Sequence, residues 1–191
     1  MYEEKDFNSL LGTTGFSDKL LQTHFKLYAG YVANTNKAME LMKSLTVGSP
    51  EWAEVKRRFG WEFNGMRLHE LYFGNMSKEQ KKLPDDHPLM KLMAETFGVA
   101  QGCHDDFVAT GKMRGIGWVI MAYDPVEKKL FNVWINEHDV GHLGGAVPLL
   151  VMDVFEHAFI MDYDMDRAAY INAFISAIDW DVVAKRFEEA Q

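Results

Sequence analysis

The sequence predicts an α+β fold: an N-terminal antiparallel helical hairpin followed by a C-terminal α/β half with a three-stranded antiparallel sheet. In the first 75 residues, apolar side chains recur every three or four positions along two long stretches, the spacing of helices that bury one face. Residues 117–152 instead contain three short β-rich runs, and two further helical patterns follow them. A chain of 191 residues, 48% of them hydrophobic, can bury a sizeable core in one domain or in two small halves.

The first predicted helix begins near residue 19 and ends near residue 45. Ser17 is its expected N-cap, because a short polar side chain can accept from the free N–H groups of the first turn. The second helix should begin at Pro50, where the missing N–H costs little, with Ser49 as its N-cap. Two long helices joined by so short a loop should lie antiparallel.

Residues 77–86 (SKEQKKLPDD) are polar, charged and interrupted by proline. They are the expected junction between an N-terminal helical hairpin domain, residues 1–84, and a C-terminal α+β domain, residues 85–191. The later elements are expected in this order: helices over 88–96 and 99–112, strands over 117–122, 130–135 and 147–152, and helices over 166–178 and 182–190.

The composition argues against several classes of partner. Twenty-eight acidic and twenty basic residues give a net charge of −8, whereas a general nucleic-acid binder needs a basic face. No apolar run approaches the roughly 20 residues that a membrane-spanning helix requires, and the charged start lacks an apolar secretion segment. Cys103 stands alone, which favours a reducing compartment. We therefore expect a cytoplasmic protein with no nucleic-acid or membrane partner.

Two of the seven histidines should face each other across the helical hairpin. His24 shares the apolar face of the first helix, and His69 lies near the inner end of the second. A buried histidine needs partners for both ring nitrogens, and a facing pair suggests a metal site. The alternative is two core histidines that are hydrogen-bonded to the backbone.

Asp153 ends an apolar strand, where an uncompensated carboxylate is costly to bury. If the strand continued to His157, the two Cα atoms would lie about 13 Å apart, too far to share one ion. If the chain turns into a helix after Asp153, the two side chains come one turn apart on one side. Three imidazoles and a carboxylate suit iron, manganese or zinc. The alternative is an aspartate that caps the next helix.

The segment from Asp153 to Phe187 resembles the C-terminal signature of the iron/manganese superoxide dismutases. That pattern runs Asp-Val-Trp-Glu-His-Ala-Tyr, then Asp-Tyr, an arginine, a tyrosine, and an Asn-Trp or Asp-Trp pair that opens the last helix. Three further segments are similar to family motifs, in the family's order from Ser17 onward: Tyr-Val-Ala-Asn at 31–34, NGMRLHELYF at 64–73 and Gly-Ile-Gly-Trp at 115–118.

The resemblance implies a site and a reaction. The metal ligands would be His24, His69, Asp153 and His157, holding one iron or manganese ion per subunit. The reaction would be the disproportionation of superoxide to dioxygen and hydrogen peroxide. The remaining site residues would be Tyr31 as the active-site tyrosine, His138 as the hydrogen-bond partner of metal-bound solvent, and Arg167 as an arginine near the substrate entrance.

The chain departs from the family pattern at several places. It lacks the gateway histidine of helix one, and it has seven rather than eight residues from His24 to Tyr31. A seven-residue step brings Tyr31 back over His24 within roughly 20°, so we expect a regular α-helix without a π-bulge. Ile160 replaces a tyrosine, and Phe155 replaces a tryptophan. Gly65 stands where some members carry a donor side chain, so we expect open room beside it.

Glu156 resembles a family residue that bridges to the ligand histidine of a second subunit, so we expect a homodimer through Glu156 and His157. The alternative is an exposed glutamate without a partner. Two other functions remain open from the sequence. One is a metal-dependent hydrolase or oxygenase with the same ligands, and the other is a catalytically weak or silent metal-binding protein of the dismutase fold.

Overall fold

The computed structural model describes residues 1–79 and 81–191, and its long elements follow the predicted order. The helical hairpin consists of α1 (Asp18–Ser44) and α2 (Pro50–Gly74). The hydroxyls of Ser17 and Ser49 each accept a hydrogen bond from the backbone N–H three residues later. Both predicted N-caps are therefore confirmed.

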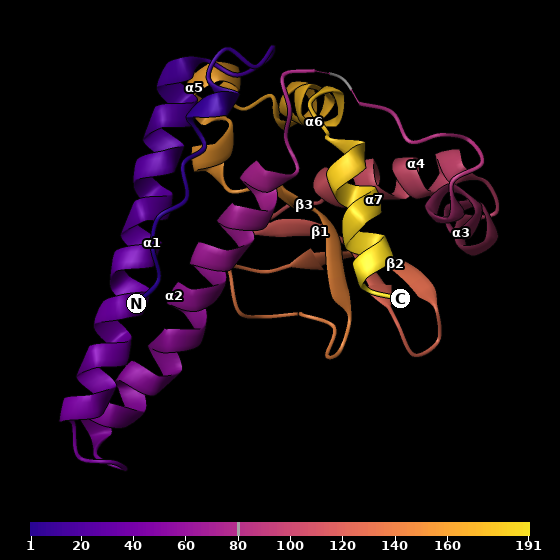
Figure 1. Ribbon diagram of the computed structural model, residues 1–191. Coiled ribbons are helices and arrows are strands. Elements are labelled where there is room, and N and C mark those ends of the chain that lie inside the picture. Colours follow the sequence, from indigo (N-terminus) through magenta and orange to yellow (C-terminus); the bar gives the residue numbers. More distant parts are fainter. Residues whose placement is uncertain (80) are drawn as a thin grey trace.

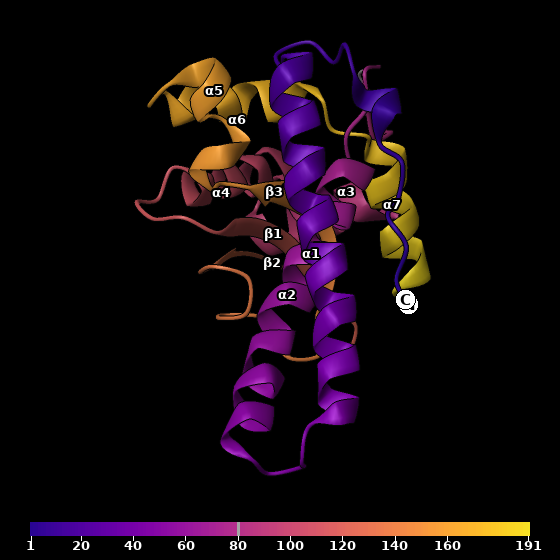
Figure 2. The same ribbon diagram turned by 90° about the vertical axis from the view of Figure 1, so that its left-hand side faces the viewer.

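Helix α1 is α-helical along its whole length and contains no π-helical turn, as predicted. His24 and Tyr31, seven residues apart, therefore lie on the same face, and both are buried. The antiparallel α1 and α2 pack along each other, and their connecting loop projects beyond the sheet (Figures 1 and 2). Most buried side chains of the hairpin lie near the other end, where it meets the sheet.

The sheet has three antiparallel strands in the order β2–β1–β3, which confirms the predicted sheet. They are β1 (Trp118–Asp124), β2 (Lys129–Ile135) and β3 (Val147–Asp153). The central strand β1 is buried at every position except its last residue. Its register places Trp118 directly opposite Asp153, so the sheet itself brings this indole beside the predicted ligand.

Helix α4 (Ala100–Gly111) packs against β1 and β2, and α3 (Pro88–Phe97) packs against β2, whereas α2 and α7 (Trp180–Glu189) pack against β3. Figure 1 shows the sheet between the hairpin and the pair α3–α4. The chain also contains helix α6 (Arg167–Ser176). The sequence did not predict three short elements: 3-10 turns at Asn8–Leu10 and Glu156–Ala158, and α5 (Ile160–Tyr163). Among the described residues, no helix combines the length and apolar character needed to cross a bilayer.

Buried polar contacts tie the two halves of the chain together. The Asn75 side chain donates to the carbonyl of Val151 at 3.2 Å and accepts from its N–H at 2.9 Å. The guanidinium of Arg186 in α7 donates to the carbonyls of Leu71 and Leu149. Burial lowers the pKa of Arg186 to about 10. These contacts fix α2 against β3, and the division at residue 84 stays a prediction.

Candidate metal centre

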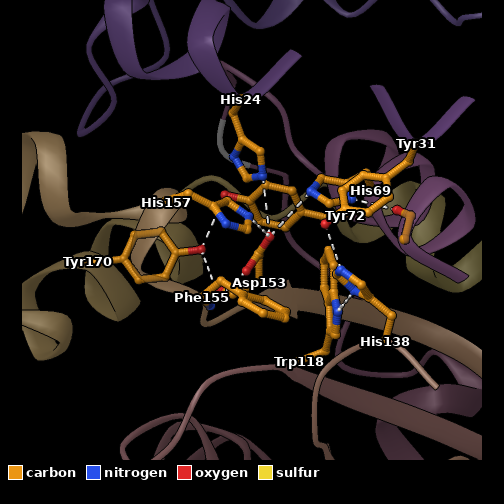
Figure 3. A network of polar contacts seen from close by, with 11 residues as sticks. His24, Tyr31, His69, Tyr72, Trp118, His138, Asp153, Phe155, His157 and Tyr170 are labelled. Atoms are coloured by element: carbon orange, nitrogen blue, oxygen red, sulfur yellow. Dashed lines mark hydrogen bonds and ion pairs between the residues drawn. The ribbon is translucent and has the colours of Figure 1, made fainter. Parts of the chain in front are cut away.

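Four side chains from four separate elements converge near the end of the helical hairpin that lies opposite its connecting loop (Figure 3). Each offers one ligand atom, and these atoms all lie within 4.8 Å of one another. The Nε2 atoms of His24, His69 and His157 lie 3.2, 3.6 and 3.0 Å from Oδ2 of Asp153. The side chain of His157 is 29% exposed, whereas the other three have no exposed side-chain surface. The predicted ligands thus form one cluster suitable for a single metal ion.

Asp153 is positioned by the end of β3 and by the turn that follows it. Its carbonyl oxygen accepts the hydroxyl proton of Tyr170 at 2.6 Å. One carboxylate oxygen, Oδ1, accepts the N–H of Phe155 at 2.8 Å, while Oδ2 faces the histidines. The chain turns after Asp153 as expected, but into a 3-10 turn at Glu156–Ala158 rather than an α-helix. Oδ1 thus holds the backbone just before this turn, which has no side-chain cap, and Oδ2 is left to face the imidazoles.

The protonation pattern of His69 tests whether these residues fit a metal ion. Its Nδ1 lies 2.5 Å from the carbonyl oxygen of Gly65, which can only accept, so Nδ1 carries the ring proton. Nε2 therefore presents a lone pair to Asp153 Oδ2, and it has no hydrogen-bond partner among the described residues. Two lone-pair atoms that face each other away from water repel unless a cation lies between them. The residues fit a bound metal cation.

The charges of the cluster agree with this interpretation. Burial is the largest cause that lowers the pKa of His24 and of His69, so both imidazoles are neutral and can donate lone pairs. Burial by itself raises the pKa of Asp153, but His157 and His24 beside it hold this pKa well below its usual range. One ionised carboxylate and three imidazole nitrogens make a donor set that suits iron, manganese or zinc.

Tyr31 and His138 form a hydrogen-bonded pair next to this cluster. Nε2 of His138 lies 2.8 Å from Oη of Tyr31, and the indole N–H of Trp118 donates to Nδ1 at 3.0 Å. An indole can only donate, so Nδ1 accepts, and the proton of the neutral imidazole resides on Nε2. Burial lowers the pKa of His138 to about 4, so the ring is neutral at pH 7. His138 therefore donates to Tyr31.

The hydroxyl proton of Tyr31 is not used within this pair. Burial first, and then the charge of Asp153, raise the pKa of Tyr31 above its usual value, so the phenol stays protonated. Because Oη accepts from His138, the O–H of Tyr31 is available for a further acceptor. The Tyr31 ring stacks on His69 with centroids 5.2 Å apart, which places this hydroxyl at the edge of the ligand cluster.

The expectation of open room beside Gly65 is wrong. A Cβ atom added to Gly65 would lie 2.5 Å from Cδ1 and 2.6 Å from Cε1 of Tyr31. The aromatic ring therefore fills the space that a side chain on α2 would take. The identity of residue 65 alone could not indicate this, because the Tyr31 ring comes from the facing helix α1.

Arg167 lies at the start of α6, where its guanidinium donates to the carbonyls of Met113 and Gly115 at 2.8 and 2.6 Å. None of its hydrogen bonds within the described parts of the chain reaches the four ligands. It holds the segment before β1, and its place at a substrate entrance stays a prediction.

Glu156 is exposed next to His157. The Phe155 ring stacks on the His157 ring, with centroids 5.2 Å apart.

Two tyrosines that the sequence pattern did not single out as site residues support the site. Tyr170 anchors the carbonyl of Asp153, and its hydroxyl lies 3.2 Å from that of Tyr72. The Tyr72 ring in turn packs beside His24, with centroids 5.4 Å apart. A tyrosine within an apolar helical pattern is a usable signal, since a buried phenol normally finds a hydrogen-bond partner.

Comparison with known proteins agrees with this geometry. Residues 84–186 match the family model of the C-terminal domain of iron/manganese superoxide dismutases. The chain is 34% identical to an iron superoxide dismutase from Aquifex pyrophilus, across 98% of this chain and 92% of that protein. It is 33% identical to an iron superoxide dismutase from Cupriavidus metallidurans, with 93% and 91% covered. A manganese superoxide dismutase from Haloferax volcanii is 34% identical, with 91% and 88% covered. The chain belongs to the iron/manganese superoxide dismutase family.

Proposed function

We propose that the protein disproportionates superoxide to dioxygen and hydrogen peroxide at one iron or manganese ion per subunit. The ion is held by His24, His69, Asp153 and His157. The observation that carries the proposal is the lone pair of His69 Nε2, which faces the carboxylate of Asp153 across 3.6 Å in a buried site. The family relationship supports iron or manganese as the cation.

When bound, iron or manganese supplies a one-electron couple between its 3+ and 2+ states, which zinc lacks. In the overall reaction one superoxide is oxidised to dioxygen, and a second takes up one electron and two protons to give hydrogen peroxide. The protein must therefore bind the ion, admit a small anion and supply protons. Aromatic rings crowd the ligands. The ring centroids of Phe73 and His24 lie 4.9 Å apart, and so do those of Trp118 and His69. This crowding favours a diatomic substrate over the larger substrates of a hydrolase or oxygenase.

Tyr31 and His138 are the catalytic residues of the proposal. Hydrogen bonds run in one direction, from the Trp118 indole to His138 Nδ1 and from His138 Nε2 to Tyr31 Oη. This direction leaves the Tyr31 O–H as the terminal donor, which can hold a proton at the edge of the ligand cluster. Arg167 is assigned as the positive charge that attracts the anion in a chain of net charge −8.

We propose that the protein is cytoplasmic and that it forms a homodimer joined through Glu156 and His157. The Nε2 atom of His157 faces Asp153, so its Nδ1 is left to donate outward, on a side chain that is 29% exposed. An exposed carboxylate next to it, Glu156, is suited to accept this N–H from a second copy of the chain. Such a contact would orient the ligand imidazole and raise its basicity.

The test is elemental analysis of the purified protein combined with superoxide consumption by separately prepared iron-loaded and manganese-loaded forms. The proposal predicts one ion per chain and catalytic consumption with at least one of the two metals. Stoichiometric metal without consumption by either form would instead support a catalytically silent metal-binding protein.

A further inference from the structure

The Tyr31–His138 pair is covered by Trp61 of α2. The Trp61 ring lies edge-on to His138, with centroids 4.5 Å apart, and 5.5 Å from the Tyr31 ring. Arg58, nearly one turn earlier on α2, places its guanidinium 4.0 Å from the centroid of the indole. Trp61 is half-buried, whereas His138 has no exposed surface and Tyr31 is 9% exposed. The indole thus stands between the pair and solvent.

The indole N–H of Trp61 donates to Oε2 of Glu137 at 3.1 Å, and Glu137 directly precedes His138. Glu137 has φ = 52°, in the left-handed region that favours glycine. In the described part of the chain, eight glycines and two other non-glycine residues, Lys128 and Asp164, also have positive φ. Of the three non-glycine residues, Glu137 directly precedes a site residue, and contacts of its side chain can offset the free-energy cost of this conformation. The contact observed is the hydrogen bond that it accepts from Trp61.

Two further contacts lie within the loop that carries Glu137 and His138. The ring of His142 lies with Nε2 2.8 Å from the carbonyl of His138, and the backbone of Asn136 pairs with that of Val140. The hydrogen bonds from Trp61 to Glu137 and between His138 and Tyr31 both join this loop to the helical hairpin. The first is therefore in a position to influence how His138 lies against Tyr31.

We propose that Trp61 and Glu137 form a latch between α2 and the loop after β2, which positions His138 against Tyr31 and closes the pair from bulk water. Both are positioning residues, because they act through His138. Their hydrogen bond is single and lies near the surface, so it opens thermally and admits the water that resupplies protons to Tyr31. Only this last consequence rests on the proposed function.

The experiment measures hydrogen exchange by NMR in the metal-free protein. It follows two N–H groups: the Nε2–H of His138, and the indole N–H of Trp118 that donates to Nδ1 of the same His138 ring. Trp61→Phe keeps a ring but removes the donor, and Glu137→Gly favours positive φ but removes the acceptor. Each should raise the exchange rates about three- to tenfold, the factor expected from one hydrogen bond of ordinary strength. Glu137→Gln keeps an acceptor oxygen and should exchange like the native chain.

The double variant, Trp61→Phe with Glu137→Gly, should exchange no faster than either single variant. Trp52→Phe, nine residues earlier on the same helix, is the matched control and should show native rates. Native exchange in Glu137→Gly would overturn the proposal, because the backbone alone would then set the loop. So would additive effects in the double variant.

The loaded enzyme provides an independent readout. If Trp61→Phe and Glu137→Gly shift the pH profile of superoxide consumption alike and Glu137→Gln does not, the latch governs proton supply. If exchange behaves as predicted but no loaded form consumes superoxide, the latch stands and the proposed function fails. If superoxide is consumed but exchange is unchanged in every variant, the latch alone fails.

Discussion

Replacing Gly65 with alanine should push Tyr31 away from α2 and loosen it from His138. The new Cβ would lie 2.5, 2.6 and 2.9 Å from Cδ1, Cε1 and Cγ of Tyr31, whereas carbon atoms in contact prefer about 3.5–4.0 Å. The ring must therefore move by about 1 Å. A shift of that size is enough to break the 2.8 Å hydrogen bond between Tyr31 Oη and His138 Nε2.

Gly60 supplies a matched control on the same helix, because a Cβ added there meets nothing within 4 Å. Alanine is favoured over glycine inside a helix by about 0.5–1 kcal/mol at either position. Overpacking a filled site costs about 1–3 kcal/mol, and only Gly65 is filled. Gly65→Ala should therefore be less stable than Gly60→Ala by about 1–3 kcal/mol.

Urea unfolding of the metal-free protein, followed by circular dichroism, measures this difference directly. The native chain and both variants should unfold with the same denaturant slope and different midpoints. If Gly65→Ala is stabilised as much as Gly60→Ala, Tyr31 is not lodged against α2, and the arrangement of the Tyr31–His138 pair described above is wrong.

Three further outcomes are expected. Asp153→Asn keeps the size of the side chain but removes its charge, so elemental analysis after dialysis should find nearly no bound ion; one ion per chain would contradict the ligand set. Folding lowers the pKa of His138 from 6.5 to about 4, so the unfolded chain takes up this proton first as the pH falls. The stability contribution of a neutral His138 is complete above pH 6.5 and is lost progressively down to pH 4. A His138→Gln variant should lack this part of the pH dependence, roughly 3 kcal/mol of unfolding free energy, in acid-to-neutral urea titrations. Glu156→Ala should elute with the mass of a monomer in light scattering and bind less metal; a dimeric variant with full metal content would refute the bridge.

The helices and strands could be predicted because their signals are local. Ser17, Ser49 and Pro50 mark helix starts within a few residues, and the apolar periodicity of α1 fixed which face carries His24 and Tyr31. The separation of Asp153 and His157 excluded a continuous strand as the basis of a shared site. The structure then showed a 3-10 turn, whose short length leaves no periodic pattern to detect.

The contacts that sequence reasoning missed all join distant segments. Tyr31 fills the space beside Gly65 from the opposite helix, and Tyr170 reaches the backbone of Asp153 from α6. The hydrogen bond from Trp61 to Glu137 spans 76 positions and depends on a backbone conformation that a glutamate rarely adopts. Such contacts depend on how the two halves pack, which no local pattern specifies.

The most direct test of the metal centre is anomalous X-ray diffraction from crystals of the iron- or manganese-loaded protein. One anomalous peak per chain is expected, bound by Nε2 of His24, His69 and His157 and by Oδ2 of Asp153. A peak outside this cluster, or ordered imidazoles that hydrogen-bond directly to Asp153 with no ion between them in the loaded crystals, would contradict it.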